Sequence, residues 1–584
     1  MNAINPVDTN PMRDEPPVAP RPIPVYEALA LDIRAMGVKS VFGLMSDDTA
    51  LLATTLDSMG VRFYGARHEN NAVAMAEGFA AASGGLGIAI VGRGPATANA
   101  MHGAVYANRT GSAVLLISGY ESTAPAAPNA MGPDGKAFNV VDALRAAGLQ
   151  TVLASDATTA RLALAQASRA AMRGCCVALL LPVNVQTAML EAPVSPDGMA
   201  AHPVAAAGSP QRAARPAAVA AAAAVLQRSR KPLFIAGLGA WRAGAREAIA
   251  ALAEKTGAVL ATSLKAKDLF RGHPDNLGII GSFSHSAARR MFDEADCIVT
   301  FGAGLNQRTT SYGTAFPADA PLIQIDVDRS RIGRWHHADI ALIGDAREIA
   351  HQLHAACTDK SASDKPFHGD AHRRRLAEFD PASDFQPVSG PRTVDPRSLA
   401  IELDRLLPAD RNAVFDAGNF LQVLPYISLE GPARLKNTHD FSSIGMGFGT
   451  AMGFAHGSPG RCTVLFIGDG AFLMSLGELE TVVREDIPLV IVLMNDCAYG
   501  AELHFLKSRN MPVSKSVFPD IDYAPIGAGF GFEVATIRTL DDLRALGPML
   551  AKPDGPVLLD CKINASVAAP FLLETVEHER RKRT

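Results

Sequence analysis

The sequence predicts an α/β protein of three doubly wound parallel-sheet domains. Short apolar runs alternate along the chain with turns of small residues and with longer Ala-rich amphipathic stretches. This alternation of strand and helix patterns is typical of parallel sheets that are covered by helices. With 584 residues, the chain also exceeds the size of a single hydrophobic core. The apolar runs that we interpret as strands are 87–91, 113–118, 177–182, 232–236, 297–301, 322–327, 412–415, 463–467, 489–494 and 556–561.

Two segments interrupt this rhythm and divide the chain. Residues 190–213 are rich in Pro, Ala and Ser, and residues 358–395 carry many charges together with Pro and Ser, so we expect both to be linkers. The domains are therefore expected at 22–190, 212–357 and 391–575. Residues 1–21 are rich in Pro, Asp and Asn without an apolar core, which predicts a disordered leader rather than a signal peptide.

Composition excludes several classes of protein. Hydrophobic residues make up 48% and charged residues 20%, as in ordinary globular enzymes, and a net charge of −4 gives no basic face for nucleic acid. No apolar run is long enough to span a membrane. The seven cysteines include the adjacent pair Cys175 and Cys176 but no CxxC motif, which favours reduced thiols in a cytoplasmic protein.

The strongest chemical signal lies in the third block. Gly468-Asp469-Gly470 follows the expected strand 463–467, and Asn495-Asp496 follows the expected strand 489–494. Adjacent parallel strands collect ligands at their carboxyl ends, where oxygen ligands can hold a hard divalent cation and a helix N-terminus can face a phosphate. Either piece alone fits a plain turn equally well. Two such pieces, each after a buried strand, favour a site.

This pattern resembles the signature of thiamine-diphosphate enzymes, in the branch that contains acetolactate synthase, 2-oxo-acid decarboxylases and benzaldehyde lyase. The resemblance implies that Asp469, Asp496 and the main-chain oxygen of Ala498 bind Mg²⁺. It also implies that thiamine diphosphate is the cofactor. The family more often has Asn in the place of Asp496, so this acid is a departure that adds negative charge, and Asn495 remains an alternative ligand. The cofactor-binding residues implied around this turn are Gly468, Gly470 and Ala471.

The first block carries a second resemblance. Arg67-His68-Glu69, followed by Ala76-Glu77-Gly78-Phe79-Ala80, is similar to the family segment that supplies a buried glutamate. The resemblance implies that Glu69 is catalytic and activates the aminopyrimidine ring, so that a ring nitrogen removes the C2 proton intramolecularly. The alternative for Glu69 is an ordinary glutamate at the start of a helix. Asn99, which ends the turn 94–99, is expected to bind the cofactor in the same pocket.

A glycine-rich segment at 442–453 resembles the family segment that contacts the pyrimidine. There Ser442 and Ile444 are implied as cofactor-binding residues, with Ile444 as the apolar wedge between the two rings. Gly418 and Asn419, shortly after the expected strand 412–415, are expected to line the diphosphate pocket.

The middle block offers only weak evidence for a ligand. Gly237-Leu238-Gly239 after the strand 232–236 resembles a dinucleotide turn, but a lone glycine turn is common. Some relatives bind FAD in this domain and others leave it empty. We expect it to be empty here.

The resemblance runs from about residue 22 to 570 and implies a lyase or transferase, a decarboxylase or carboligase that acts on a 2-oxo acid, an aldehyde or an acyloin. It also implies a homodimer or homotetramer, because in this family the cofactor lies between two subunits. Asp47 and Glu502 fall where decarboxylase-like relatives carry catalytic acids, although the histidine pair of those enzymes is absent from 120–142. Two alternatives stay open, a dinucleotide-dependent oxidoreductase and a non-catalytic thiamine-diphosphate-binding paralogue. The sequence leaves the exact substrate and the direction of the reaction open.

Overall fold

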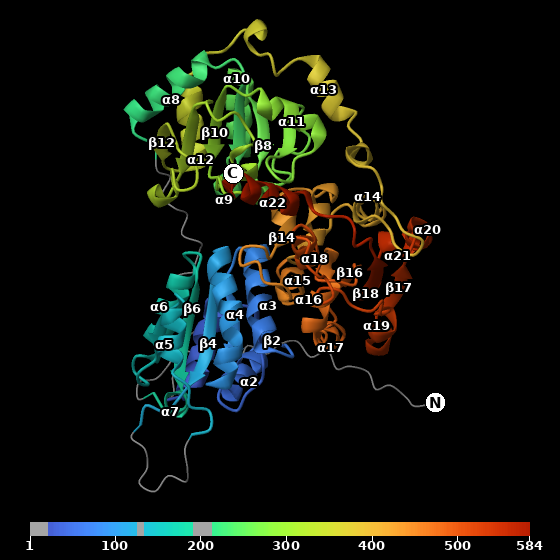
Figure 1. Cartoon of the computed structure of the whole chain (residues 1–584). Coiled ribbons are helices and arrows are strands. Elements are labelled where there is room, and N and C mark those ends of the chain that lie inside the picture. The colour runs from blue at the N-terminus through green and yellow to red at the C-terminus, as the bar shows by residue number, and fades with distance from the viewer. Residues whose placement is uncertain (1–21, 125–133, 191–212, 584) are drawn as a thin grey trace, which may run out of the picture.

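Three α/β domains, each built on a six-stranded sheet, make up the computed structural model, which describes residues 22–124, 134–190 and 213–583 (Figure 1). The strands pair in parallel within every sheet, so the predicted fold class is confirmed. The leader predicted at 1–21 and most of the linker predicted at 190–213 lie outside the described residues.

The first domain has the strand order β2-β1-β3-β4-β6-β5. Its strands are β1 (Ser40–Gly43), β2 (Arg62–Gly65), β3 (Gly87–Val91), β4 (Val114–Tyr120), β5 (Gln150–Leu153) and β6 (Cys176–Pro182). Its helices are α1 (Val25–Ala35), α2 (Ala50–Ser58), α3 (Glu69–Ser83), α4 (Pro95–Thr110), α5 (Val140–Ala146), α6 (Ala160–Ala171) and α7 (Val183–Thr187).

The middle domain has the order β12-β11-β10-β7-β8-β9, which is the order of dinucleotide-binding sheets. Its strands are β7 (Pro232–Ala236), β8 (Val259–Thr262), β9 (Asn276–Ile279), β10 (Cys297–Phe301), β11 (Leu322–Asp326) and β12 (Ile340–Ile343). Its helices are α8 (Pro216–Arg228), α9 (Leu238–Arg242), α10 (Arg246–Thr256), α11 (Ser286–Asp293) and α12 (Ala346–Ala356). The predicted linker 358–395 contains a helix of its own, α13 (Asp370–Ala377).

The third domain repeats the topology of the first, with the order β14-β13-β15-β16-β18-β17. Its strands are β13 (Asn412–Phe415), β14 (Leu435–Asn437), β15 (Thr463–Gly468), β16 (Leu489–Asn495), β17 (Glu533–Ile537) and β18 (Val557–Lys562). Its helices are α14 (Pro396–Leu406), α15 (Met446–Gly457), α16 (Asp469–Met474), α17 (Glu478–Arg484), α18 (Gly500–Lys507), α19 (Ala524–Phe530), α20 (Leu540–Ala545), α21 (Gly547–Ala551) and α22 (Pro570–Arg583).

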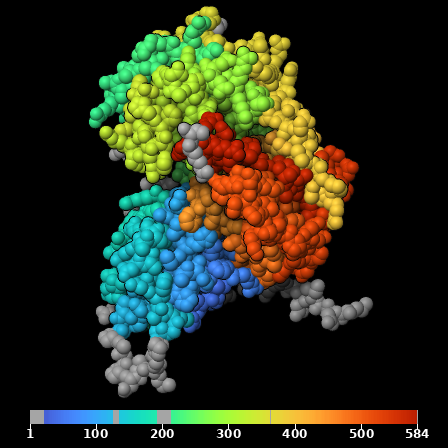
Figure 2. Space-filling model, viewed as in Figure 1, coloured from blue at the N-terminus to red at the C-terminus, as the bar shows by residue number. Residues whose placement is uncertain are grey.

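The first and third domains share one hydrophobic core, and Figure 2 shows them in direct contact. Helices α3 and α15 pack so closely that a Cβ added at Gly453 would lie 1.8 Å from the carbonyl oxygen of Met75. The two helices run side by side with their starts together, because Asn70 contacts Met446 at one end and Gly457 approaches Phe79 at the other. Glycine at this crossing therefore brings the start of α3 to the start of α15.

Helix α22 connects the third domain to the middle one. It lies against the middle domain in Figures 1 and 2, and Arg308 donates to the main-chain oxygen of Phe571 at 2.6 Å. Among the described helices, none is both long and apolar enough to cross a lipid bilayer.

Candidate functional site

Strands β15 and β16 bring Asp469 and Asp496 to one edge of the third sheet. The register pairs Ile467 with Leu493 and Gly468 with Met494, so the residues that follow these strands emerge side by side. Asp469 is the first residue of α16 and is only 2% exposed, whereas Asp496 is partly exposed. The structure thus brings together the two acids that the sequence analysis proposed as metal ligands.

Little positive charge offsets these two carboxylates, because Lys562, whose charge lowers the pKa of Asp469, also pairs with Asp520 and Asp560. Burial raises the pKa of Asp469 to about 6. Burial and the charge of Asp469 raise the pKa of Asp496 to about 8. Two neighbouring carboxylates, one of which raises the pKa of the other, are an arrangement that a divalent cation stabilises. The donor set therefore fits a hard cation such as Mg²⁺.

The loop after β16 has an unusual backbone conformation at Cys497, between the proposed ligands Asp496 and Ala498. Cys497 has a positive φ of 54°, which is uncommon for a residue with a side chain. Asp496 accepts a hydrogen bond from the Ala498 N–H at 3.2 Å, and Ala498 forms an isolated bridge with Val517. A Cβ added at Gly500 would lie 2.4 Å from the Asp496 Oδ2, so this position requires glycine if the carboxylate is to keep its place.

Asn495, the alternative ligand, has other partners. Its amide nitrogen donates to Asp560 Oδ1 at 2.8 Å, and its oxygen accepts from the Cys497 N–H at 3.1 Å. Because both ends of this side chain are engaged, Asp496 is the residue with oxygen available for a cation.

Small residues surround the start of α16. Ala471 is buried, and a Cβ at Gly470 would meet the ring of Tyr499 at 2.5 Å. Gly468 immediately precedes this helix, and Gly418 precedes the short helix η6 (Asn419–Tyr426). The space beside these glycines is taken by aromatic rings, of Tyr499 at Gly470 and of Phe420 at Gly418 and Gly468.

The side chain of Asn419 has a different task. Its nitrogen donates to the Val567 oxygen at 2.9 Å, and its oxygen accepts from the Ala569 N–H at 2.8 Å. The amide therefore anchors the segment that leads into α22, and only the main chain of Asn419 remains for a cofactor.

The turn that carries Ser442 and Ile444 is held by a buried acid. Asp416 is fully buried at the end of β13 and accepts from the main-chain N–H of Gly445 at 2.7 Å and from Thr438 at 2.8 Å. Burial raises the pKa of Asp416 to about 6. Ser442 is exposed with a φ of 56°, and Ile444 is partly buried against the shared core. Asp416 thus fixes the turn that presents Ile444.

Glu69 begins α3 and is 8% exposed. Asn99, from the start of α4, donates to its Oε2 at 3.1 Å, so two residues that the sequence analysis placed in one pocket do meet. The next residue, Asn70, contacts Met446, and a Cβ at Gly445 would lie 3.7 Å from the Ala471 oxygen. A chain of short contacts therefore links the neighbourhood of Glu69 to the turn at 442–446 and to α16.

The two other predicted acids are more open. The Asp47 side chain is 80% exposed and pairs with Lys136 at 2.5 Å, and Glu502 is exposed on α18. The enclosed acid of the first loop is Asp48, which is 6% exposed and pairs with Arg93 at 2.9 Å and with Lys136 at 2.9 Å. No hydrogen bond within the described residues joins Asp47 or Glu502 to Glu69.

The glycine turn of the middle domain is filled by its neighbour. The Gly239 N–H donates to the Gly302 oxygen at 3.0 Å, and a Cβ at Gly237 would lie 2.3 Å from the Cα of Ala303. This contact closes the point between β7 and β10 where a sheet of this order binds a dinucleotide.

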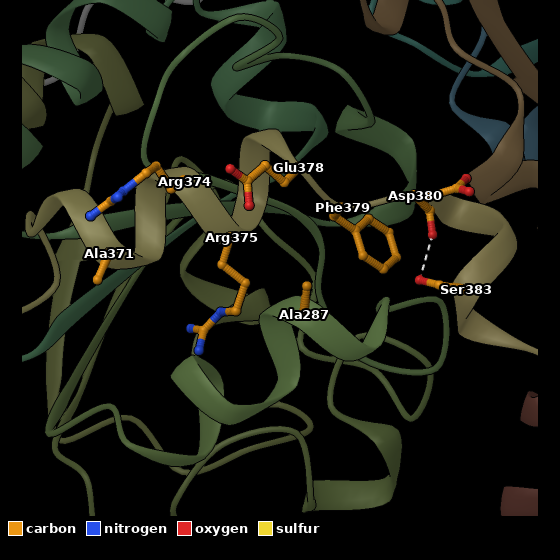
Figure 3. Close-up of a pocket in the computed structure, with 8 residues that line it drawn as sticks. All are labelled: Ala287, Ala371, Arg374, Arg375, Glu378, Phe379, Asp380 and Ser383. Carbon is orange, nitrogen blue, oxygen red and sulfur yellow. Dashed lines mark hydrogen bonds between the residues drawn. The ribbon is translucent and has the colours of Figure 1, made fainter.

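A separate hollow lies between α11 and the linker helix α13 (Figure 3). It measures about 590 Å³ and is shallow. Arg374 and Arg375 extend from it in different directions, and the hydrogen bond drawn there joins Ser383 to the main-chain oxygen of Asp380. Its lining side chains do not converge on a common point, unlike the acids at the edge of the third sheet.

Comparison with known proteins gives the same three-part division. Three models of the thiamine pyrophosphate enzyme family match the chain. They are the N-terminal TPP binding domain over residues 23–132, the central domain over 219–353 and the C-terminal TPP binding domain over 416–561. A probable sulfoacetaldehyde acetyltransferase of Rhizobium meliloti is 27% identical, with 88% of this chain and 89% of that protein covered. A probable acetolactate synthase large subunit of Methanocaldococcus jannaschii is 27% identical, covering 94% and 93%. A probable 2-ketoarginine decarboxylase of Pseudomonas aeruginosa is 28% identical, covering 88% and 90%.

Proposed function

The chain belongs to the thiamine pyrophosphate enzyme family, and from that premise we propose that it makes or breaks the carbon–carbon bond next to a carbonyl group. Its substrates are 2-oxo acids, aldehydes or acyloins, the compounds on which such lyases and transferases act. The observation that carries this proposal is the pair of neighbouring acids, buried Asp469 and partly exposed Asp496, that follow adjacent strands in the domain described as TPP-binding. This assignment displaces the dinucleotide-dependent oxidoreductase as an explanation of the fold.

The residues present fit the cofactor and its metal. Asp469, Asp496 and the main-chain oxygen of Ala498 would hold Mg²⁺. The main chain around Gly418, Gly468, Gly470 and Ala471 would face the diphosphate, with Asn419 contributing its main chain. Ser442 and Ile444 would meet the pyrimidine. When bound, thiamine diphosphate supplies a carbon nucleophile and an electron sink for cleavage or formation of the bond.

The acid–base part of the reaction is assigned to side chains of this chain. Glu69, at the start of α3, would hydrogen-bond the aminopyrimidine ring of the bound cofactor and so assist proton transfer there. Asn99 donates to Glu69 Oε2 and so orients the carboxyl group. Asp47 and Glu502 are proposed to move protons to and from the substrate, and their exposure keeps both in exchange with solvent.

We further propose that the active form is a homodimer or homotetramer. Large apolar side chains are exposed on α16, at Tyr499 beside Gly470, and along the chain from α18 to Val517. A second copy of the chain would cover them, as exposed apolar patches of this kind mark interaction surfaces. The residues concerned are Leu473, Met474, Tyr499, Phe505, Met511 and Val517.

Two further features of the proposal concern the middle domain and the location in the cell. The Gly239 N–H donates to the Gly302 oxygen, so main chain packs closely at the sheet end where a dinucleotide would approach, which supports a domain without FAD. All seven cysteines are free thiols, and burial raises the pKa of Cys297 to about 12. Unreactive buried thiols of this kind support a reducing, cytoplasmic environment.

The substitution Glu69→Gln tests the function without knowledge of the natural substrate. Exchange of the cofactor C2 proton for deuterium, followed by NMR on the holoenzyme, should slow by about 10²- to 10⁴-fold, because an amide cannot share a proton as a carboxyl group does. Glu247→Gln, an exposed glutamate on α10, is the matched control and should exchange like the wild type. Unchanged exchange in Glu69→Gln would remove Glu69 from the mechanism, and absence of exchange in the wild type would favour the non-catalytic paralogue.

A further inference from the structure

A buried glutamate of the third domain holds the turn that presents Glu69. Glu478 begins α17 and is 1% exposed. Its Oε1 accepts from the main-chain N–H of Arg67 at 3.0 Å and from the Asn71 side-chain nitrogen at 2.9 Å. Its Oε2 accepts from Thr481 on its own helix at 2.7 Å. One carboxylate thus holds two points of the first domain from the third.

The two points bracket Glu69 in the chain. Arg67 lies two residues before Glu69 and Asn71 two residues after it, so Glu478 fixes the turn on both sides of the proposed catalytic acid. The guanidinium group of Arg67 pairs with Glu480 at 2.6 Å and not with Glu478. Glu478 Oε1 therefore accepts only from the Arg67 main-chain N–H and the Asn71 side-chain nitrogen in this region. Three hydrogen bonds to one carboxyl group fix its direction as well as its distance from each partner.

The other end of this connection leads to the proposed metal site. Helix α17 follows α16, which begins at Asp469. Glu478 therefore ties the turn that carries Glu69 to the segment that carries a proposed metal ligand. Displacement of a reacting group by about 1 Å costs on the order of 100-fold in rate, so a shift of this turn would slow the step assigned to Glu69.

We propose that Glu478 is a positioning residue, which sets where the Glu69 carboxyl group lies relative to the cofactor and does not itself touch it. This inference rests on the proposed function. It assigns a role to an acid that makes no contact with Glu69 and that carries no sequence signature of its own.

Shortening the side chain tests the proposal directly. Glu478→Asp keeps the charge but withdraws the carboxylate by one methylene group, whereas Glu478→Gln keeps the length and an acceptor oxygen for both amides. We expect C2 proton exchange in the holoenzyme to slow by about 10- to 100-fold in Glu478→Asp and by less than about 3-fold in Glu478→Gln. Cofactor affinity should stay within about 3-fold in both variants, because neither touches the proposed metal ligands.

Two controls separate positioning from general stability. Thr481→Val removes only the partner on the helix of Glu478 itself and should exchange like the wild type. In the double variant Glu69→Gln with Glu478→Asp, the second substitution should slow exchange no further, because it acts through Glu69. Additive losses, or a Glu478→Asp enzyme that exchanges normally, would overturn the proposal.

The outcomes also distinguish this inference from the proposed function. If Glu69→Gln slows exchange but Glu478→Asp does not, only the positioning role fails. If Glu69→Gln itself exchanges normally, the proposed function fails. Should Glu478→Asp not fold, Glu478→Gln alone tests the proposal. Slow exchange in Glu478→Gln with unchanged cofactor affinity would show that the charge of Glu478 matters more than its geometry, and would contradict the positioning role.

Discussion

The middle and third domains carry the same kind of glycine turn and use it differently. In the middle domain, Gly239 donates to Gly302, and neighbouring main chain fills the end of the sheet. In the third domain, Gly468 and Gly470 flank Asp469, whose charge helps to raise the pKa of the neighbouring Asp496 to about 8. A glycine turn after a strand is therefore no evidence of a ligand by itself. Polar groups that converge at that point without enough opposite charge are evidence of one.

The largest expected effect is the loss of cofactor binding in Asp469→Ala. Removal of a metal ligand should weaken Mg²⁺-dependent binding of thiamine diphosphate by more than about 100-fold. Mutation of a residue that only hydrogen-bonds to a metal ligand typically costs less than this. Asp326→Ala, at the carboxyl end of β11 in the middle sheet, is the matched control and should bind normally. Titration calorimetry measures the cofactor affinity of both variants. An equal loss of affinity in Asp469→Ala and Asp326→Ala would contradict a ligand site specific to the third sheet.

The pH dependence of metal binding should be the next largest effect. Without metal, the pKa values of Asp469 and Asp496 are raised to about 6 and about 8, so protons compete with the cation below these values. Affinity for Mg²⁺ should therefore rise as the pH increases from 6 to 8, by up to about tenfold per unit for each proton displaced, and should level off above 8. In Asp496→Asn the rise towards pH 8 should disappear. A flat profile in the wild type would mean that these acids do not bind the metal.

A smaller effect is expected from added methyl groups, and it should differ in kind between the two sheets. Gly500→Ala pushes against Asp496 and should weaken cofactor binding about tenfold with little change in stability. Gly302→Ala, where φ is 55° and the new Cβ would lie 2.6 Å from the Gly239 Cα, should lower the free energy of unfolding by about 1–3 kcal/mol. Its cofactor affinity should remain normal. Thermal denaturation and calorimetry on both variants measure the two effects. A destabilised Gly500→Ala with normal binding, or a stable Gly302→Ala with weak binding, would contradict the prediction.

The sequence predicted the interior of the fold better than its edges. Each of the ten apolar runs forms a strand, from β3 through β18, because buried parallel strands are continuously apolar. The strands that were missed are short, and several lie at sheet edges with mixed exposure, such as β2, β5 and β17. In β2, β5 and β17 polar residues interrupt the apolar ones, and the missed strand β12 is apolar throughout but only four residues long.

The site divides along a similar line. Asp469 and Asp496 could be paired from sequence because each directly follows a buried strand, and Glu69 could be placed by its resemblance to a family segment. Glu478 could not be found, because its partner Arg67 is 411 residues away and the contact depends on how two domains pack. The engagement of Asn419 with Val567 and the enclosure of Asp48 by Arg93 are likewise results of packing. Local patterns reveal groups at strand ends but not the residues that hold them in place.

The measurement that tests the account most directly is a calorimetric titration of the purified protein with thiamine diphosphate, once with Mg²⁺ and once with a chelator. The account predicts saturable binding with one coenzyme per chain when Mg²⁺ is present, and none when it is removed. Binding that ignores the metal, or a protein that takes up no thiamine diphosphate at all, would contradict it.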